Sequence, residues 1–140
     1  MQVVLDTNVF VSGIFYSGPP YEILNAWRRG TLDLVVSLDI LTEYYRVGGE
    51  LARRFPGGAL RPVLDLLAVR GQIVHAFPLP ERVCTDPDDD KFLACALSSG
   101  TKIVVSGDKS LRRVSGYLGI RVLSPREFVD ARLGKEGQPA

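Results

Sequence analysis

Short apolar runs along the chain alternate with longer segments in which apolar residues recur every three or four positions. The runs have the length of buried strands, and the periodic segments are typical of helices that bury one face. The pattern predicts strands over residues 2–5, 32–36, 72–75, 102–105 and 120–123. It predicts helices over residues 19–30, 38–46, 59–69 and 86–98, with a separate short helix between the breaks at 48–49 and 55–58.

The order of these elements, strand then helix and repeated, predicts a parallel sheet whose strands are joined by helical crossovers. Such a sheet is covered by helices on both faces. We therefore expect an α/β fold, a three-layer α/β/α sandwich around a central, mostly parallel sheet of about five strands. At 140 residues, the chain is expected to form a single domain over residues 1–133, followed by a flexible tail over 134–140.

Composition excludes several classes of protein. Hydrophobic residues make up 46% of the chain and charged residues 24%, which favours a packed core over disorder. The apolar runs are far shorter than the roughly 20 residues that cross a bilayer, so we expect no membrane-spanning helix. No basic start of a secretory signal precedes Asp6, and a cytoplasmic location is expected.

Thiol and imidazole chemistry is disfavoured. The chain has two cysteines, Cys84 and Cys95, and one histidine, His75. Two thiols cannot form a four-thiolate zinc site, and we expect both to be reduced. His75 has no sequence neighbour suited to nucleophilic or zinc chemistry, so a catalytic triad is not expected.

Acidic side chains occur where the expected sheet would bring them together. Asp6 follows the first strand, Asp108 follows the fourth, Glu43 lies on the helix after the second strand, and Asp89 begins the helix before the fourth. Ligands of open α/β sheets bind at the carboxyl ends of the strands, so these side chains are expected to converge. Clustered carboxylates repel one another unless a cation neutralises them, and oxygen-only ligands favour Mg²⁺ or Mn²⁺.

Each of these acids also has a structural explanation. Asp86-Pro87 is a strong helix start, because an N-cap Asp and the acids after it satisfy the positive end of the helix. Capping does not require four acids within residues 86–90, and it leaves Asp6 unexplained. Glu43 alone could be a solvated helix residue. Arginine supplies 13 of the 17 cations and suits phosphate groups, although a solvated helix face is the favoured explanation for any one of these arginines.

At these residues the sequence resembles the PIN-domain family. The resemblance rests on four ordered motifs: Val4-Leu5-Asp6-Thr7-Asn8-Val9, then Glu43, then the run DPDDDKFLACA over residues 86–96, then Val105-Ser106-Gly107-Asp108. It extends from Val3 to about Val129 and is similar to the prokaryotic branch of the family that is classed as toxins of toxin-antitoxin pairs. It implies a metal-dependent ribonuclease that cleaves RNA phosphodiester bonds, a type II toxin with a cognate antitoxin, and a homodimer.

The resemblance also implies roles for individual residues. It matches the family's four acids, which are both catalytic and metal-binding, to Asp6, Glu43, Asp89 and Asp108. One or two Mg²⁺ or Mn²⁺ ions would be bound by the three aspartates, with Glu43 acting directly or through water. Supporting hydrogen bonds are expected from Thr7, Asn8, Asp86, Asp90 and Ser106. RNA phosphate contacts are expected from Arg46, Arg53 and Arg54.

Asp90 is the alternative third acid. Asp89 is preferred because the apolar residues Phe92, Leu93 and Ala96 follow it by three, four and seven positions, which places it on the helix face that packs against the sheet.

Two other functions stay open. The chain could be a non-catalytic module that binds RNA or a protein partner. Less favoured is a phosphohydrolase with Asp6 as nucleophile, because that chemistry uses a second Asp two residues later, where this chain has Asn8.

Overall fold

The strands form one sheet that is parallel throughout, in the order β3-β2-β1-β4-β5. The computed structural model describes residues 1–133, so the tail expected over 134–140 lies outside the described residues. The strands are β1 (Gln2–Leu5), β2 (Asp33–Ser37), β3 (Gln72–Val74), β4 (Ile103–Val105) and β5 (Arg121–Leu123). The predicted parallel sheet of about five strands is confirmed.

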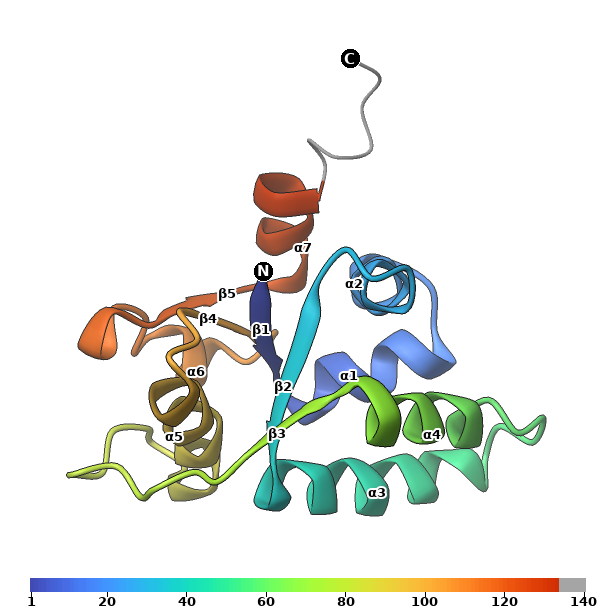
Figure 1. Ribbon diagram of the computed structural model, residues 1–140, viewed down its shortest axis with the longest axis horizontal. Coiled ribbons are helices and arrows are strands. Elements are labelled where there is room, and N and C mark those ends of the chain that lie inside the picture. Colours follow the sequence, from blue (N-terminus) through green and yellow to red (C-terminus); the bar gives the residue numbers. More distant parts are fainter. Residues whose placement is uncertain (134–140) are drawn as a thin grey trace.

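Helices lie on both sides of this sheet, which confirms the three-layer α/β/α arrangement (Figure 1). The longer helices are α1 (Thr7–Phe15), α2 (Pro19–Arg28), α3 (Leu38–Ala52), α4 (Leu60–Arg70) and α5 (Asp90–Ser99). Shorter helical segments are η1 (Pro87–Asp89), α6 (Lys109–Arg112), η2 (Tyr117–Gly119), α7 (Pro125–Phe128) and η3 (Val129–Leu133). In Figure 1, α5 lies to the left of β1 and β2, whereas α1, α2 and α4 lie to their right. Within residues 1–133, none of the helices combines the length and the apolar character that crossing a membrane requires.

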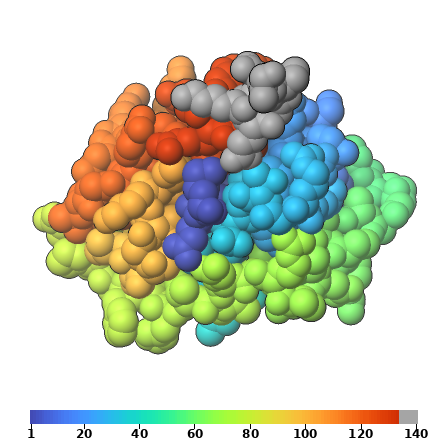
Figure 2. Space-filling model, turned by 45° about the horizontal axis from the view of Figure 1, so that its top comes forward, coloured from blue at the N-terminus to red at the C-terminus, as the bar shows by residue number. Residues whose placement is uncertain are grey.

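β1 occupies the centre of the sheet, between β2 and β4. Its residues Val3, Val4 and Leu5 are buried, as expected for a parallel strand that is covered on both faces. Figure 2 shows the start of the chain, in blue, lying between the cyan region that includes β2 and the orange region that includes β4. The carboxyl ends of β1 and β4 therefore lie side by side, and the residues that follow these strands can meet there.

Helix α1 is not predicted by the hydrophobic pattern, which places no helix before residue 19. Most of α1 is apolar, with Val9, Phe10 and Val11 all buried, so the helix lacks the polar face that would mark its period. It packs closely against α2: a Cβ on Gly13 would lie 2.7 Å from the Pro20 carbonyl oxygen. Glycine at this position lets the two helices approach each other.

The predicted break at Gly48-Gly49 is wrong, because α3 continues from Leu38 to Ala52 without interruption. Gly48 is buried, and a Cβ on it would lie 2.9 Å from Leu60 Cδ1. Gly48 therefore accommodates α4 and does not end α3. The helix expected over 86–98 begins with the turn η1 and continues as α5.

Candidate active site

The four predicted acids line one cleft at the carboxyl ends of the central strands. The cleft has a volume of ≈ 260 Å³ and is lined by Asp6, Thr7, Asn8, Glu43, Arg46, Val47, Asp89, Phe92 and Asp108. These residues come from the end of β1, the start of α1, helix α3, the η1–α5 junction and the start of α6. The sheet order thus brings together acids that are far apart in the sequence.

Asp6 is held firmly at the end of β1. Its carboxylate caps α1, since Oδ1 accepts a hydrogen bond from Val9 N at 2.8 Å, and its Oδ2 accepts one from Ser106 Oγ. Burial raises the pKa of Asp6 to about 6; the hydrogen bonds from Ser106 and Val9 oppose this rise, and the charges of Asp108 and Glu43 add to it. A carboxyl group with this pKa is mostly ionised at pH 7 and can then bind a cation, whereas below about pH 6 it is mostly protonated.

Ser106 links Asp6 to Asp108. Its buried hydroxyl donates to Asp6 and accepts a hydrogen bond from Asp108 N at 3.0 Å. The Asp108 side chain caps α6 by accepting from Ser110 N at 2.8 Å. The Asp6 carboxylate and the Asp108 backbone N–H are therefore joined through a single hydroxyl.

Asp89 faces the same cleft from the turn η1. Burial raises the pKa of Asp89 to about 6, and the charges of Asp86, Asp108, Asp6 and Asp88 raise it further. Asp86 itself caps η1, with Oδ1 accepting from Asp88 N at 3.0 Å. Asp86 therefore acts on the cleft through its charge and through the turn that it starts.

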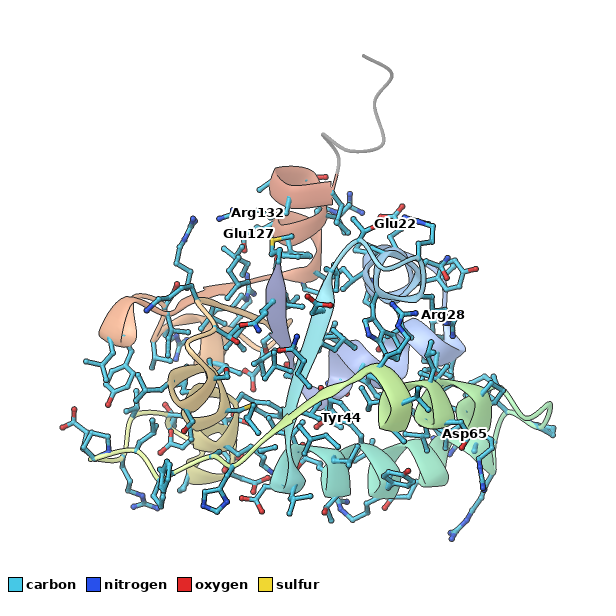
Figure 3. The ribbon with its side chains drawn as sticks, viewed as in Figure 1. Glu22, Arg28, Tyr44, Asp65, Glu127 and Arg132 are labelled. Carbon is cyan, nitrogen blue, oxygen red and sulfur yellow. The ribbon has the colours of Figure 1, made fainter. Side chains whose placement is uncertain are left out.

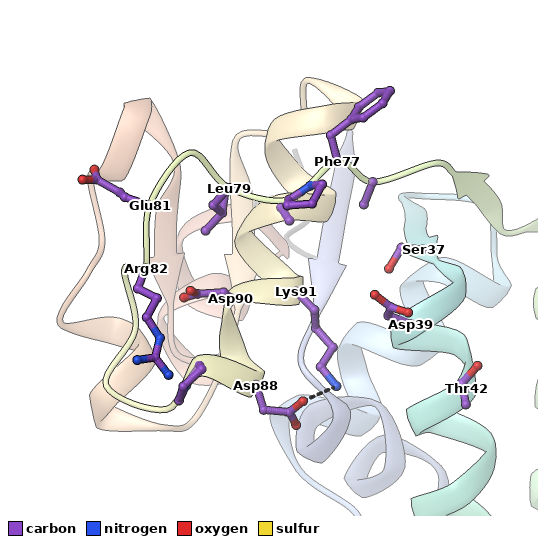
Figure 4. A pocket seen from close by; sticks show the side chains of 14 residues that line it. Ser37, Asp39, Thr42, Phe77, Leu79, Glu81, Arg82, Asp88, Asp90 and Lys91 are labelled. Atoms are coloured by element: carbon purple, nitrogen blue, oxygen red, sulfur yellow. Dashed lines mark ion pairs between the residues drawn. The ribbon is translucent and has the colours of Figure 1, made fainter.

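Asp90 does not line the cleft but a separate groove, which is drawn in Figure 4. Its carboxylate accepts hydrogen bonds from Cys84 N at 2.8 Å and from Val83 N at 3.3 Å. Burial alone would raise the pKa of Asp90, but the hydrogen bonds to Cys84 and Val83, helped by the charge of Arg82, lower it below its usual value. Asp90, for which a supporting role is predicted, thus holds the segment before α5 through Val83 N and Cys84 N and does not line the cleft.

Glu43 reaches the cleft from α3 and has polar partners on both oxygens. Oε1 lies 2.7 Å from Lys91 Nζ, and Oε2 accepts a hydrogen bond from Thr7 Oγ1. Burial would lower the pKa of Lys91, but its bonds to Glu43 and Asp88 raise it. Lys91 is not predicted from the sequence as a site residue. The available signal is its position three residues after Asp88 on a helix, where the two side chains pair at 3.2 Å.

The predicted RNA-contacting arginines are in different places. Arg46 lines the cleft and pairs with Glu50 at 3.6 Å and with Glu43 at 3.9 Å. Arg53 and Arg54 are exposed beyond the end of α3 and do not line the cleft. Asn8 is exposed and does line it.

Neither cysteine offers a reactive thiolate. Cys84 and Cys95 are free and buried, and burial raises the pKa of each thiol to about 12. Thiolate chemistry is therefore not expected, and the carboxylate oxygens of the cleft are the candidate reactive groups.

The acids fit a divalent cation by donor type and by charge. The cleft offers carboxylate oxygens, and the pKa values of Asp6 and Asp89 are raised in part by neighbouring acids, a repulsion that a hard cation would relieve. Within residues 1–133, no three His, Cys, Asp or Glu side chains are already arranged as the ligands of one ion. Asp6, Glu43 and Asp108 are instead hydrogen-bonded to Ser106, Lys91 and Ser110 N respectively.

Comparisons with known proteins agree with this arrangement. A sequence model described as "PIN domain" matches residues 2–110, a range that contains all four acids of the cleft. "Uncharacterized protein MJ1680" of Methanocaldococcus jannaschii is 33% identical over 141 residues, which cover 93% of this chain and 90% of that protein.

The fold is also similar to a solved structure. A chain in the crystal structure of VapBC2 from Rickettsia felis, bound to a DNA fragment from their promoter, superposes with a TM-score of 0.58 and 14% sequence identity. The match covers 89% of this chain and 98% of that chain. At 14% identity, the similarity to this solved structure concerns the fold alone. The match to the PIN domain sequence model, in contrast, covers most of the chain and shows the family. This chain belongs to the PIN domain family.

Proposed function

We propose that this protein is a divalent-metal-dependent endoribonuclease and the toxin of a type II toxin-antitoxin pair. The observation that carries the proposal is the gathering of Asp6, Glu43, Asp89 and Asp108 in one cleft, where burial and mutual repulsion raise the pKa of two of them. PIN domains are generally nucleases, and an oxygen-only cluster of this kind suits Mg²⁺ or Mn²⁺.

Asp6, Asp89 and Asp108 would hold the ion, with Glu43 nearby. A bound divalent ion supplies positive charge that stabilises a phosphorane-like transition state and makes a coordinated water more acidic. The chain's own residues supply position: the bonds from Val9 N and Ser106 Oγ keep the Asp6 carboxylate in one orientation. This holds a ligand in place before substrate binds, which lowers the cost of assembling the site.

Arg46 supports RNA as the substrate class. Its side chain is exposed on the wall of the cleft, where a guanidinium can make paired hydrogen bonds to a phosphate. The cleft is small and open, and the chain has a formal charge of only +1. We expect a flexible single strand or loop to enter it more readily than a duplex, which is stiff and depends on a broad basic surface.

An antitoxin partner is proposed from the likeness to VapBC2, whose fold this chain shares. An acidic cleft of this kind would be neutralised by a cation, and the bidentate donors of arginine suit its carboxylates. We expect the antitoxin to place an Arg there and block cleavage. Cleavage that continues in the presence of saturating antitoxin would argue against this partner.

The function is tested by incubating the purified protein with mixed RNA in Mg²⁺, in Mn²⁺ and in EDTA, followed by mapping of the product ends. We expect cleavage with either ion, none in EDTA, and 5′-phosphate and 3′-hydroxyl ends, as when water attacks the phosphorus and the 3′ oxygen leaves with a proton. Asp6→Asn should be inactive, and Asp65→Asn should be as active as the wild type, since Asp65 is exposed on α4 outside the cleft (Figure 3). Cleavage in EDTA or by Asp6→Asn would overturn the proposal, and RNA binding without cleavage would favour a non-catalytic module.

A further inference from the structure

Lys91 joins α5 to α3 through an ion pair that is largely shielded from solvent. Its Nζ lies 2.7 Å from Glu43 Oε1 and 3.2 Å from Asp88 Oδ1. The side chains of Lys91 and Glu43 are 15% and 13% exposed, whereas those of the surface pair Arg61–Asp65 are 84% and 66% exposed. Replacing one member of a shielded, hydrogen-bonded ion pair lowers the stability of the fold, because the remaining charge is left without a partner.

The other oxygen of Glu43 is used to hold the start of α1. Oε2 accepts a hydrogen bond from Thr7 Oγ1, and Thr7 directly follows Asp6. Contacts therefore run from Lys91 through Glu43 to Thr7, linking α5, α3 and the start of α1. Both carboxylate oxygens of Glu43 are committed within this chain of contacts.

The residue after Glu43 fixes α3 at the same place. The Tyr44 hydroxyl donates to the Leu5 carbonyl oxygen at 2.5 Å, and its ring stacks on Phe10 with centroids 4.0 Å apart. Figure 3 shows Tyr44 between α3 and the sheet. Because Leu5 directly precedes Asp6, α3 holds the backbone on both sides of the first acid.

The charges in the cleft are divided unequally. Within residues 1–133, no lysine or arginine forms an ion pair with Asp6, Asp89 or Asp108, whereas Glu43 Oε1 has the Lys91 ammonium group 2.7 Å away. Figure 4 shows Lys91 extending from α5 toward Asp88, with which it also pairs. Among the described residues, the three aspartates of the cleft therefore have no cationic partner of their own, whereas Glu43 has Lys91.

We propose that Lys91 is the built-in counter-cation of Glu43, and that Glu43 is a positioning residue that holds Thr7 beside Asp6, not a direct ligand of the metal. The inference rests on the proposed nuclease for the nature of the ion, but the Lys91–Glu43 pairing is independent of it. It reduces the metal-ligand set to Asp6, Asp89 and Asp108.

The pairing is tested in metal-free protein by a double-mutant cycle. Lys91→Met, Glu43→Gln and the double variant are unfolded with urea in EDTA, with Arg61→Met and Asp65→Asn as the matched cycle on an exposed pair. We expect a coupling of about tenfold in the unfolding equilibrium constant for Lys91–Glu43 and less than about twofold for Arg61–Asp65. Lys91→Arg should recover most of the stability that Lys91→Met loses. Equal coupling in the two cycles would overturn the role of Lys91, and Lys91→Gln replaces Lys91→Met if the latter does not fold.

The role of Glu43 is tested by calorimetric titration with Mn²⁺ alone. We expect Glu43→Gln to change the Kd for Mn²⁺ by less than about threefold and Asp6→Asn and Asp89→Asn to weaken it by about tenfold or more, as for the loss of a ligand. Glu43→Gln should nevertheless lower kcat for RNA, because Thr7 and Asp6 lose their support. Loss of Mn²⁺ affinity in Glu43→Gln equal to that in Asp6→Asn would overturn the inference. A wild-type protein that binds no Mn²⁺ would instead overturn the proposed function, and the metal-free cycle would still decide the pairing.

Discussion

Asp6 is an acid whose charge is unfavourable in the folded protein without a cation. Its pKa is about 6 in the folded chain, against 3.8 as the ordinary value, so the folded state holds the proton more tightly than the unfolded state does. The stability that this proton provides is complete below about pH 4 and is lost as the pH rises through about 6.

Asp6→Asn should therefore stabilise the metal-free protein at pH 7, by on the order of 2 kcal/mol. Asparagine keeps the cap on α1 because its side-chain oxygen can still accept from Val9 N. The measurement is urea unfolding in EDTA at several pH values between 4 and 7. The wild type should lose stability relative to the variant across this range, and parallel pH profiles would contradict the assigned pKa.

The three consecutive acids at residues 88–90 should respond differently to amide substitution. Asp89→Asn should abolish metal-dependent cleavage, because Asp89 lines the cleft. Asp88→Asn should leave most of it, because Asp88 is exposed and pairs with Lys91. Asp90→Asn should cost about 1 kcal/mol of stability, because an amide is a weaker acceptor for Val83 N and Cys84 N.

Single-turnover cleavage at saturating Mg²⁺, together with urea unfolding of each variant, separates these effects. An active Asp89→Asn beside an inactive Asp90→Asn would move the third acid by one residue.

The sequence is informative about the acids and about their hydroxyl partners Thr7 and Ser106, but it does not reveal the pairing of Lys91 with Glu43. The spacing of Phe92, Leu93 and Ala96 favours Asp89 over Asp90 as the acid on the sheet side of α5, and the structure places Asp89 in the cleft. Lys91 and Glu43 are 48 residues apart on two helices, and no local period connects them. Their pairing depends on how α3 and α5 pack, which is a property of the whole fold.

At the scale of elements, the adjacent glycines in α3 should differ in their tolerance of a side chain. Gly49→Ala should stabilise the protein by about 0.5–1 kcal/mol, because alanine favours the helix and a Cβ there meets nothing within 4 Å. Gly48→Ala should gain less or lose stability, because its Cβ would lie 2.9 Å from Leu60 Cδ1. Thermal unfolding of the two variants tests this difference. Equal gains in stability would show that α4 moves to accommodate a Cβ at position 48 at little cost.

These glycines also explain where prediction of elements from the sequence is limited. A pair of glycines predicts the end of a helix because glycine weakens helices. In this chain, however, Gly48 lies inside α3 and leaves room for Leu60 of α4. Helix α1 escapes the pattern for the opposite reason, since it is apolar on nearly every side. The strands are predicted well because each contains a short apolar run bounded by polar residues or turns, although β3 is largely exposed.

At the scale of the whole molecule, an ion bound in the cleft should stabilise the folded state. Mn²⁺ at 100 times its Kd should add about 2.7 kcal/mol if the unfolded chain does not bind it. The gain should be larger at pH 7.5 than at pH 5.5, because Asp6 and Asp89 take up protons near pH 6. A thermal-shift titration tests this, with Asp65→Asn expected to match the wild type and Asp6→Asn to show little gain. An equal gain for Asp6→Asn would place the ion elsewhere.

The central position of β1 has a consequence for the order in which the protein is made. β1 leaves the ribosome early, but its neighbour β4 begins only at Ile103. Ser106, which holds Asp6, is 100 residues away from it in the chain. A growing chain that stops short of Ile103 already contains Asp6, Glu43 and Asp89, but it lacks Asp108, the strand β4 and the Ser106 hydroxyl that holds Asp6. The cleft can therefore be completed only late in translation, once β4, Ser106 and Asp108 have been made.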